Sequence, residues 1–134
     1  MENQKESKGL NILVWVLQVL LAISFGMAGV MKISMPISEL AEGGMSFVNS
    51  FSLEMVRFIG ISEILGALGL IIPAAIRVKP FLSALAAIGI ATIMVLATAY
   101  HLSSGEPFVT TIVLFVMAAF VAWARIKKVP ISPK

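Results

Sequence analysis

The second apolar stretch of the chain reads RFIGISEILGALGLIIP, from Arg57 to Pro73. Apart from the arginine at its start, it carries one charged side chain, Glu63, in a run that is otherwise apolar enough to lie in a membrane. A charge near the centre of a bilayer costs about 2.5–3.5 kcal/mol on insertion scales, so such residues usually face a helix bundle or a wet cavity and have a partner. The stretch therefore predicts a membrane helix with a buried acidic group.

The composition of the whole chain also indicates a membrane protein. Of its 134 residues, 59% are hydrophobic and 13% are charged, and the mean hydropathy is +1.01. Soluble domains carry about 25% charged residues, and a small soluble domain needs much polar surface because its surface-to-volume ratio is high. We therefore expect an integral membrane protein.

Four segments approach the roughly 20 apolar residues that a helix needs to cross a hydrocarbon core of about 30 Å. Barrel strands fit them less well, because their apolar residues do not alternate with polar ones. The first segment is longer than the core of a cleaved signal peptide, so we expect it to stay as an anchor. The predicted fold is all-α, an antiparallel bundle of four transmembrane helices at residues 10–126, between cytoplasmic tails 1–9 and 127–134. The expected helices span about residues 10–32, 54–76, 81–101 and 107–125.

The basic residues predict the orientation of this bundle. Four crossings put both termini on one side, and the N-terminal tail, the second connection and the chain from Arg125 onward hold eight of the ten Lys and Arg residues. Only Lys32 and Arg57 fall on the other side. By the positive-inside rule, both termini lie in the cytoplasm, and we expect the plasma membrane, or inner membrane, of a bacterium. Nucleic acid binding is not implied, because the basic residues are scattered at helix ends.

The long connection between the first two helices, residues 33–53, has its own pattern. Apolar residues recur there at near-helical spacing, and Gly43 and Gly44 interrupt the pattern. This predicts a broken amphipathic segment that lies on the outer membrane interface and caps the bundle.

The first helix offers a partner for Glu63. Gln18, Phe25 and Lys32 fall on one of its faces, together with small residues that allow another helix to approach closely. Lys32 is the expected counter-charge of Glu63, because its stem can fold toward the carboxylate or extend to the interface. Gln18 is best explained as a residue that bonds two helices together.

Two further ionisable side chains are expected at the outer level of Lys32. Arg57 opens the second helix, and His101 ends a stripe of small residues on the third. Lys32, Arg57, Glu63 and His101 are thus predicted to converge in the outer half of the bundle. The alternative is that Lys32, Arg57 and His101 are ordinary interfacial residues, and that Glu63 is a structural group bonded to a neighbouring helix.

The residue inventory excludes some chemistries. The chain has no cysteine, so it offers neither the cysteine pairs of membrane disulfide carriers nor ligands for a thiolate metal site or an Fe–S cluster. With one histidine and no aspartate, it is also poorly supplied for a metal or haem site of its own. We therefore predict no metal, and any redox chemistry would belong to a bound cofactor.

Taken in order, the motifs of the chain resemble those of the DoxX-like family of small four-helix membrane proteins. The resemblance covers about residues 14–125 and includes a histidine, His101, at the end of the third helix. Its most specific parts are a Gly-x-x-Lys that ends helix one (Gly29, Lys32) and a Gly-x-x-Glu in helix two (Gly60, Glu63). The stretches that carry it are FGMAGVMKI (25–33), VRFIGISEILGALGLIIP (56–73), LAAIGIATIMVLATAYH (85–101) and AAFVAWAR (118–125).

The resemblance implies two kinds of function. Members of the family are tied to quinone-linked oxidoreductase complexes and oxidative-stress systems, and a distant animal branch looks like an assembly chaperone for membrane receptors. On the first hypothesis the chain is a ligand-binding or oxidoreductase-associated subunit with an outer-half pocket walled by Phe25, which holds a quinone or another small amphipathic ligand. Glu63 exchanges a proton with the ligand, Lys32 holds Glu63 ionised or stabilises an anionic oxygen, and His101 relays protons outward. Its partners would be the lipid bilayer, this ligand, and a redox protein or a second copy of the chain.

On the second hypothesis the chain is a proton-coupled small transporter or a partner in membrane-protein assembly. The small multidrug transporters are also four-helix proteins with one essential membrane glutamate, but that glutamate lies in their first helix, whereas Glu63 lies in the second. The two hypotheses differ in geometry. If the Gln18–Lys32 face meets the Glu63 face inside one chain, a pocket is favoured, and if the faces point to lipid or to a second copy, transport or assembly is favoured.

Overall fold

The computed structural model describes residues 2–134, and of residues 2–6 the backbone alone. Met1 and the Lys5 side chain, which belong to the predicted tail 1–9, lie outside the described residues. The described chain is all-helical and contains no strand, as predicted. Its elements are α1 (Glu2–Ser34), α2 (Ile37–Glu42), the 3-10 helix η1 (Ser46–Asn49), α3 (Leu53–Ile76), α4 (Phe81–Ser104), α5 (Val109–Trp123) and the π-helical turn η2 (Ala124–Lys128).

In the described part of the chain, four helical segments are long and apolar enough to cross a membrane, which confirms the prediction of four membrane helices. Their outward faces keep large apolar side chains exposed, for example Leu65 at 64% and Val109 at 68%. In a membrane protein these surfaces contact acyl chains. α1 begins before the predicted residue 10. Residues 2–9 lack proline and include several residues that favour a helix. The spans are Ser7–Ser34, Leu53–Ile76, Phe81–Ser104 and Val109–Lys128.

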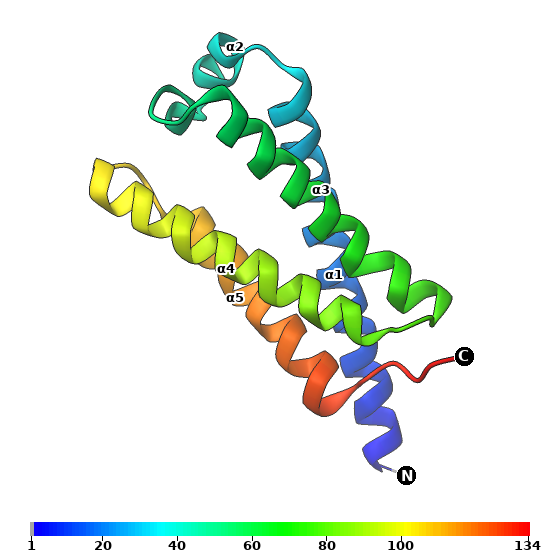
Figure 1. The fold of residues 1–134 in the computed structure, drawn as a ribbon. Coiled ribbons are helices and arrows are strands. Elements are labelled where there is room, and N and C mark those ends of the chain that lie inside the picture. The colour runs from blue at the N-terminus through cyan, green and yellow to red at the C-terminus, as the bar shows by residue number, and fades with distance from the viewer. Residues whose placement is uncertain (1) are drawn as a thin grey trace.

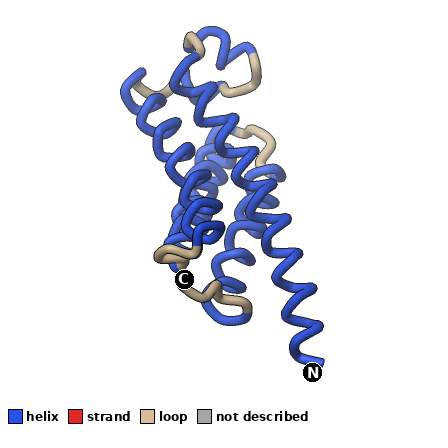
Figure 2. The backbone as a smooth tube through the Cα atoms, turned by 90° about the vertical axis from the view of Figure 1, so that its right-hand side faces the viewer, coloured by secondary structure: helices blue, strands red, loops and turns tan. Residues whose placement is uncertain are grey.

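The helices pack in two pairs that meet side by side. α1 packs against α3, α4 packs against α5, and the pairs join through α3 with α4 and α1 with α5. Figure 1 shows both chain termini at one end of the molecule, which we call the terminal end; α2, η1 and the α4–α5 turn lie at the other, the loop end. The two pairs lie together near the terminal end and diverge toward the loop end (Figure 1). The first turns of α1 project beyond the other helices (Figure 2).

The α1–α3 pair is held together by a close backbone contact. A Cβ atom added to Gly29 would lie 2.6 Å from the carbonyl oxygen of Gly60, and one added to Gly60 would lie 2.8 Å from the carbonyl oxygen of Gly29. Only glycine permits helices to approach this closely. The buried residues of α3 repeat at alternating spacings of four and three, which is the pattern of a helix that packs along a partner; they are Val56, Gly60, Glu63, Ala67, Leu70 and Ala74.

The contact between α3 and α4 explains why the pairs diverge. Cβ atoms added to Gly66 and Gly69 would lie 3.2 Å from Ile90 and 3.0 Å from Ala86, so α3 and α4 are tightly packed at this level. Toward the loop end, the α3 residues on the side of α4 are Ser62 and Ile59, which are larger than glycine. The two helices therefore separate there.

The connection between α1 and α3 covers the loop end. α2 ends at Glu42 with Gly43 as its C-cap, and Gly44 has a φ of 104°, which glycine adopts without strain. The predicted break at these two glycines is thus present. Leu40 of α2 and Val48 of η1 are buried against Val56, so the connection has an apolar core of its own.

Candidate functional site

An ion pair between α1 and α3 lies inside the bundle. Lys32 Nζ is 2.7 Å from Glu63 Oε1, and the two side chains are 8% and 4% exposed. The two helices touch at Gly29 and Gly60. Lys32 lies three positions after Gly29, and Glu63 lies three positions after Gly60. Because the backbones are so close there, the two side chains meet without leaving the space between the helices. Glu63 is the only buried carboxylate among the described residues, and Lys32 supplies its counter-charge.

A cavity of about 580 Å³ lies beside this ion pair, between α3, α4 and the connection that covers the loop end. Its volume lies in the range of about 300–1,000 Å³ that is usual for small-molecule sites. The lining is mainly apolar and aromatic, with a few polar groups, as is also usual for such sites. The lining residues are Lys32, Phe47, Phe51, Met55, Phe58, Ile59, Ser62, Glu63, Ile93, Met94, Leu96, Ala97, Tyr100, His101 and Thr111.

The cavity opens sideways between α3 and α4. Phe58 of α3 and Leu96 of α4 both line it, yet they are 64% and 66% exposed. Both residues belong to membrane-spanning segments, so the opening faces the acyl chains rather than water. The cavity therefore has buried charged residues in its wall and lipid-facing residues at its edge.

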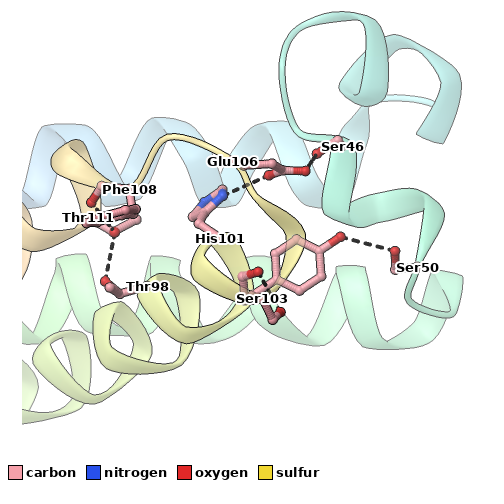
Figure 3. Close-up of polar contacts among 9 residues, drawn as sticks. Ser46, Ser50, Thr98, His101, Ser103, Glu106, Phe108 and Thr111 are labelled. Atoms are coloured by element: carbon pink, nitrogen blue, oxygen red, sulfur yellow. Dashed lines mark hydrogen bonds and ion pairs between the residues drawn. The ribbon is translucent and has the colours of Figure 1, made fainter.

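A polar chain closes the loop end of the cavity. Nδ1 of His101 lies 2.8 Å from a carboxylate oxygen of Glu106, and Ser46 Oγ donates to the other oxygen at 2.5 Å. Figure 3 shows this chain, which joins the end of α4 to the turn that follows it and to η1. The hydrogen bonds from Ser46 and then from His101 lower the pKa of Glu106 below its ordinary value. Glu106 is thus an ionised group at the rim of the bundle.

Aromatic side chains make the rest of the roof. The ring of Phe47 lies 6.4 Å from that of Tyr100, and the ring of Phe51 lies 5.7 Å from it. Ser50 Oγ and Tyr100 Oη are 3.1 Å apart, which ties the connection to α4 a second time. Lys32 Nζ lies 5.7 Å from the centre of the Phe47 ring, so the buried ammonium also has a cation–π contact.

The structure brings three of the predicted site residues into one place: Lys32, Glu63 and His101 line the same cavity. Arg57 lies beside it without lining it. Its Nη1 atom donates to the carbonyl oxygens of Lys32 at 2.5 Å and Met35 at 2.9 Å. These carbonyls lie at the C-terminal end of α1, where no helical N–H is left to bond them. Arg57 therefore caps α1 and holds the backbone of Lys32 in position.

Phe25 and Gln18 are not brought to the cavity. Phe25 is 3% exposed and packs in the main apolar core, two turns from Lys32 and about 10 Å closer to the terminal end. Gln18 donates from Nε2 to the carbonyl oxygen of Leu70 at 2.5 Å. It shares a helix face with Lys32, as predicted, but the two are 14 residues apart, about 21 Å along α1.

Gln18 belongs to a second polar network, near the terminal end. Arg125, in η2, donates from Nε to Gln18 Oε1 at 2.7 Å and from Nη1 to Asn11 Oδ1 at 2.6 Å. Its guanidinium also lies 5.4 Å from the ring of Trp15. Arg125 is 5% exposed, so it is a buried cation rather than a tail charge.

Sequence reasoning missed several of these groups. Glu106 lies in the turn after α4 and falls in the predicted connection between the third and fourth helices, although an acid five residues after His101 is a usable signal. Ser46, Phe47 and Phe51 give no such signal, because they reach α4 only through folding of the connection. Among the described side chains, those of residues 7–134, no cluster of three or more His, Cys, Asp or Glu could hold a metal ion.

The comparisons with known proteins agree with the architecture. The model of the DoxX-like family matches residues 16–124, which is most of the chain. No curated protein and no solved structure matches the chain significantly.

Proposed function

This chain belongs to the DoxX-like family, and we propose that it binds a small amphipathic, quinone-like ligand in the loop-end cavity, as a ligand-binding or oxidoreductase-associated membrane subunit. One observation carries the proposal: the buried ion pair of Lys32 and Glu63 lies in the wall of a cavity that opens to lipid. An ion pair that served packing alone would need no cavity beside it. A paired charge at this depth is costly, and such residues usually mark ligand or proton sites.

The residues fit an oxygen-bearing aromatic head group with an apolar tail. The head group would lie among Phe47, Phe51 and Tyr100, with Lys32 as the donor to one of its oxygens. The tail would leave between Phe58 and Leu96 into the bilayer. Aromatic walls favour a flat ring, because offset or edge contacts between rings add to the burial of apolar area.

The same residues can move protons at the ligand. Glu63 is the group that exchanges a proton with the bound oxygen, and Lys32 stabilises the ionised carboxylate at 2.7 Å. His101 lines the cavity and contacts Glu106 at the rim, so it is the path by which a proton leaves. A bound quinone would supply the electron-accepting chemistry, and a redox partner protein would supply the electrons.

A pocket within one chain is favoured over transport or assembly. Gln18 contacts Leu70 and Lys32 contacts Glu63, so both ends of the polar face of α1 are satisfied by α3 of the same chain. A transporter or assembly partner that used this face would present it to lipid or to another copy. The buried position of Lys32 and Gln18 argues against that use.

We further propose how the molecule lies in the membrane. The four spans would form an antiparallel bundle, with both termini in the cytoplasm of a bacterial cell and the segment of α2 and η1 on the outer interface. Support comes from the excess of basic residues in the tails and the second connection. The exposed polar positions of α2, including Glu39 and Glu42, suit a segment at the water interface.

Thermal unfolding of the purified protein in detergent tests the proposal, with decylubiquinone as the probe. The probe should raise the melting temperature of the wild type and of Glu54→Gln, but not that of Glu63→Gln. Glu54 is the matched control, because it is an exposed carboxylate on the same helix that does not line the cavity. Equal shifts in all three proteins would overturn the proposed site. No shift in the wild type would overturn binding of quinone-like ligands.

A further inference from the structure

A second pocket lies at the terminal end, far from the loop-end cavity. It has a volume of about 610 Å³ and lies between the start of α1, the end of α3 and the last residues of the chain. Its described lining residues include three cations, Lys8, Arg77 and Lys128, but no carboxylate. Neither Lys8, Arg77 nor Lys128 forms an ion pair with a described carboxylate. The proposed function uses none of these residues.

The C-terminal segment builds one wall of this pocket. Residues 129–134 leave η2 and cross toward the end of α3, as the red trace in Figure 1 shows. Arg77 fixes this crossing: its Nε atom donates to the carbonyl oxygen of Ser132 at 2.8 Å, and its own carbonyl accepts from the N–H of Lys134 at 2.9 Å. The pocket is therefore a defined feature of the fold, because these two bonds hold the C-terminal segment against the end of α3.

A fourth cation lies directly behind the pocket. The Arg125 guanidinium contacts three residues that line the pocket. These are Asn11, Trp15 and Val129, the last through its carbonyl oxygen. Arg125 is 5% exposed, and its Nη2 atom is buried with no hydrogen-bond partner among the described residues. A buried charge without a counter-charge is costly. An anion in the pocket would supply the missing charge.

The level of the pocket indicates which anions it meets. Lys8 and Lys128 lie in the end turns of their spans, and Arg77 follows directly after the end of α3. Span ends lie at the level of the lipid headgroups, where phosphate is the abundant anion. Basic pockets between membrane helices bind anionic headgroups, and Arg and Lys are the side chains that recognise phosphate. Trp15, Ala74 and Ile131 add an apolar wall that suits the start of an acyl chain.

We propose that the terminal-end pocket binds a phosphate group, carried by an anionic phospholipid or free in solution. Lys8, Arg77 and Lys128 contact the phosphate oxygens, and the charge of Arg125 attracts the group from behind. Occupation of the site ties α1, α3 and the C-terminal segment together. The site is independent of the loop-end cavity, so either can be absent without the other.

Native mass spectrometry of the full chain in detergent tests this site with three probes: phosphatidylglycerol, phosphatidylcholine and inorganic phosphate. The key variant is Lys8→Gln/Lys128→Gln. Its matched control is Lys79→Gln/Lys127→Gln, which removes the same charge from two exposed lysines outside the pocket. The key variant should bind phosphatidylglycerol about 30-fold more weakly, which corresponds to ~1 kcal/mol for each cation near an anionic headgroup. The control should bind it as the wild type does.

The probes separate the two sources of phosphate. Tight phosphatidylglycerol binding that depends on Lys8 and Lys128, with weak binding of phosphate alone, assigns the site to a lipid. The same dependence for inorganic phosphate, without a preference for phosphatidylglycerol, assigns it to free phosphate. Equal binding of phosphatidylglycerol and phosphatidylcholine with no phosphate binding would overturn the proposal. So would an equal loss of binding in the key variant and the control, because that result indicates only general surface charge.

Discussion

The contact between Gly29 and Gly60 makes a quantitative prediction about the α1–α3 pair. In Gly29→Ala the new Cβ would lie 2.6 Å from the carbonyl oxygen of Gly60 and 2.7 Å from Cγ1 of Ile64. Ordinary van der Waals contact begins at 3.4 Å, so the helices must separate by about 0.8 Å. The oxygen belongs to the backbone and cannot rotate away. Overpacking of this kind costs about 1–3 kcal/mol, so we expect Gly29→Ala to lower the free energy of unfolding by that amount.

Gly26 provides the matched control in the same helix. A Cβ added there would meet only Cβ of Ala67, at 3.8 Å, which is an ordinary contact. Since alanine favours a helix over glycine by up to about 1 kcal/mol, Gly26→Ala should be neutral or slightly stabilising. Unfolding by SDS in mixed micelles, followed by far-UV circular dichroism, measures both free energies. If Gly29→Ala proved as stable as Gly26→Ala, the close approach of α1 and α3 would be refuted.

Two further predictions concern the charged groups. Lys32→Met leaves Glu63 buried without its counter-charge and should lower the free energy of unfolding by about 3–5 kcal/mol. The double variant Lys32→Met/Glu63→Met should recover most of this loss. Equal losses in the two variants would contradict a coupled pair. The pKa of Glu106 is lowered in the folded protein by Ser46 and His101, so its contribution is fully present above the ordinary value of 4.5 and is lost as the pH falls through the lower folded value. The free energy of unfolding of the wild type should therefore fall more steeply below about pH 4.5 than that of Glu106→Gln, and parallel pH curves would contradict this assignment.

The architecture could be predicted because the membrane leaves few choices. Long apolar runs can cross a bilayer only as helices or closed barrels, and the runs in this chain lack the alternation of barrel strands. The glycines at 29 and 60 were also visible in the sequence. Their partners were not, because Gly60 contacts α1 whereas Gly66 and Gly69, on the same helix, contact α4. The direction in which each glycine points depends on the packing of all four helices.

The pairing of Lys32 with Glu63 could be anticipated because a buried charge needs a partner and few cations were available at that level. The rim of the site was harder to predict. Ser46 and Glu106 are 60 positions apart, and no periodicity connects them. They meet because the connection folds over the loop end, a tertiary event that leaves no local signal.

Arg125 shows a different limit of sequence analysis. A basic residue at the end of a span is expected from the positive-inside rule, so its position suggested a topological charge. In the structure it lies in the π-helical turn η2 and points to Gln18 and Asn11 of α1. The two amides within the first membrane span, Asn11 and Gln18, were a weak sign of a buried donor. Their partner, 107 residues from Gln18, was not identifiable from spacing.

Photolabelling with a quinone that carries an azido group tests the central claim most directly, because it locates the ligand in the folded protein. After irradiation in membranes and digestion, mass spectrometry identifies the labelled residues. The account predicts labels on Met55, Phe58 and Tyr100, which line the loop-end cavity, and their loss when unlabelled decylubiquinone competes. Labels spread over lipid-facing residues such as Leu65, with no effect of the competitor, would contradict a ligand site beside Lys32 and Glu63.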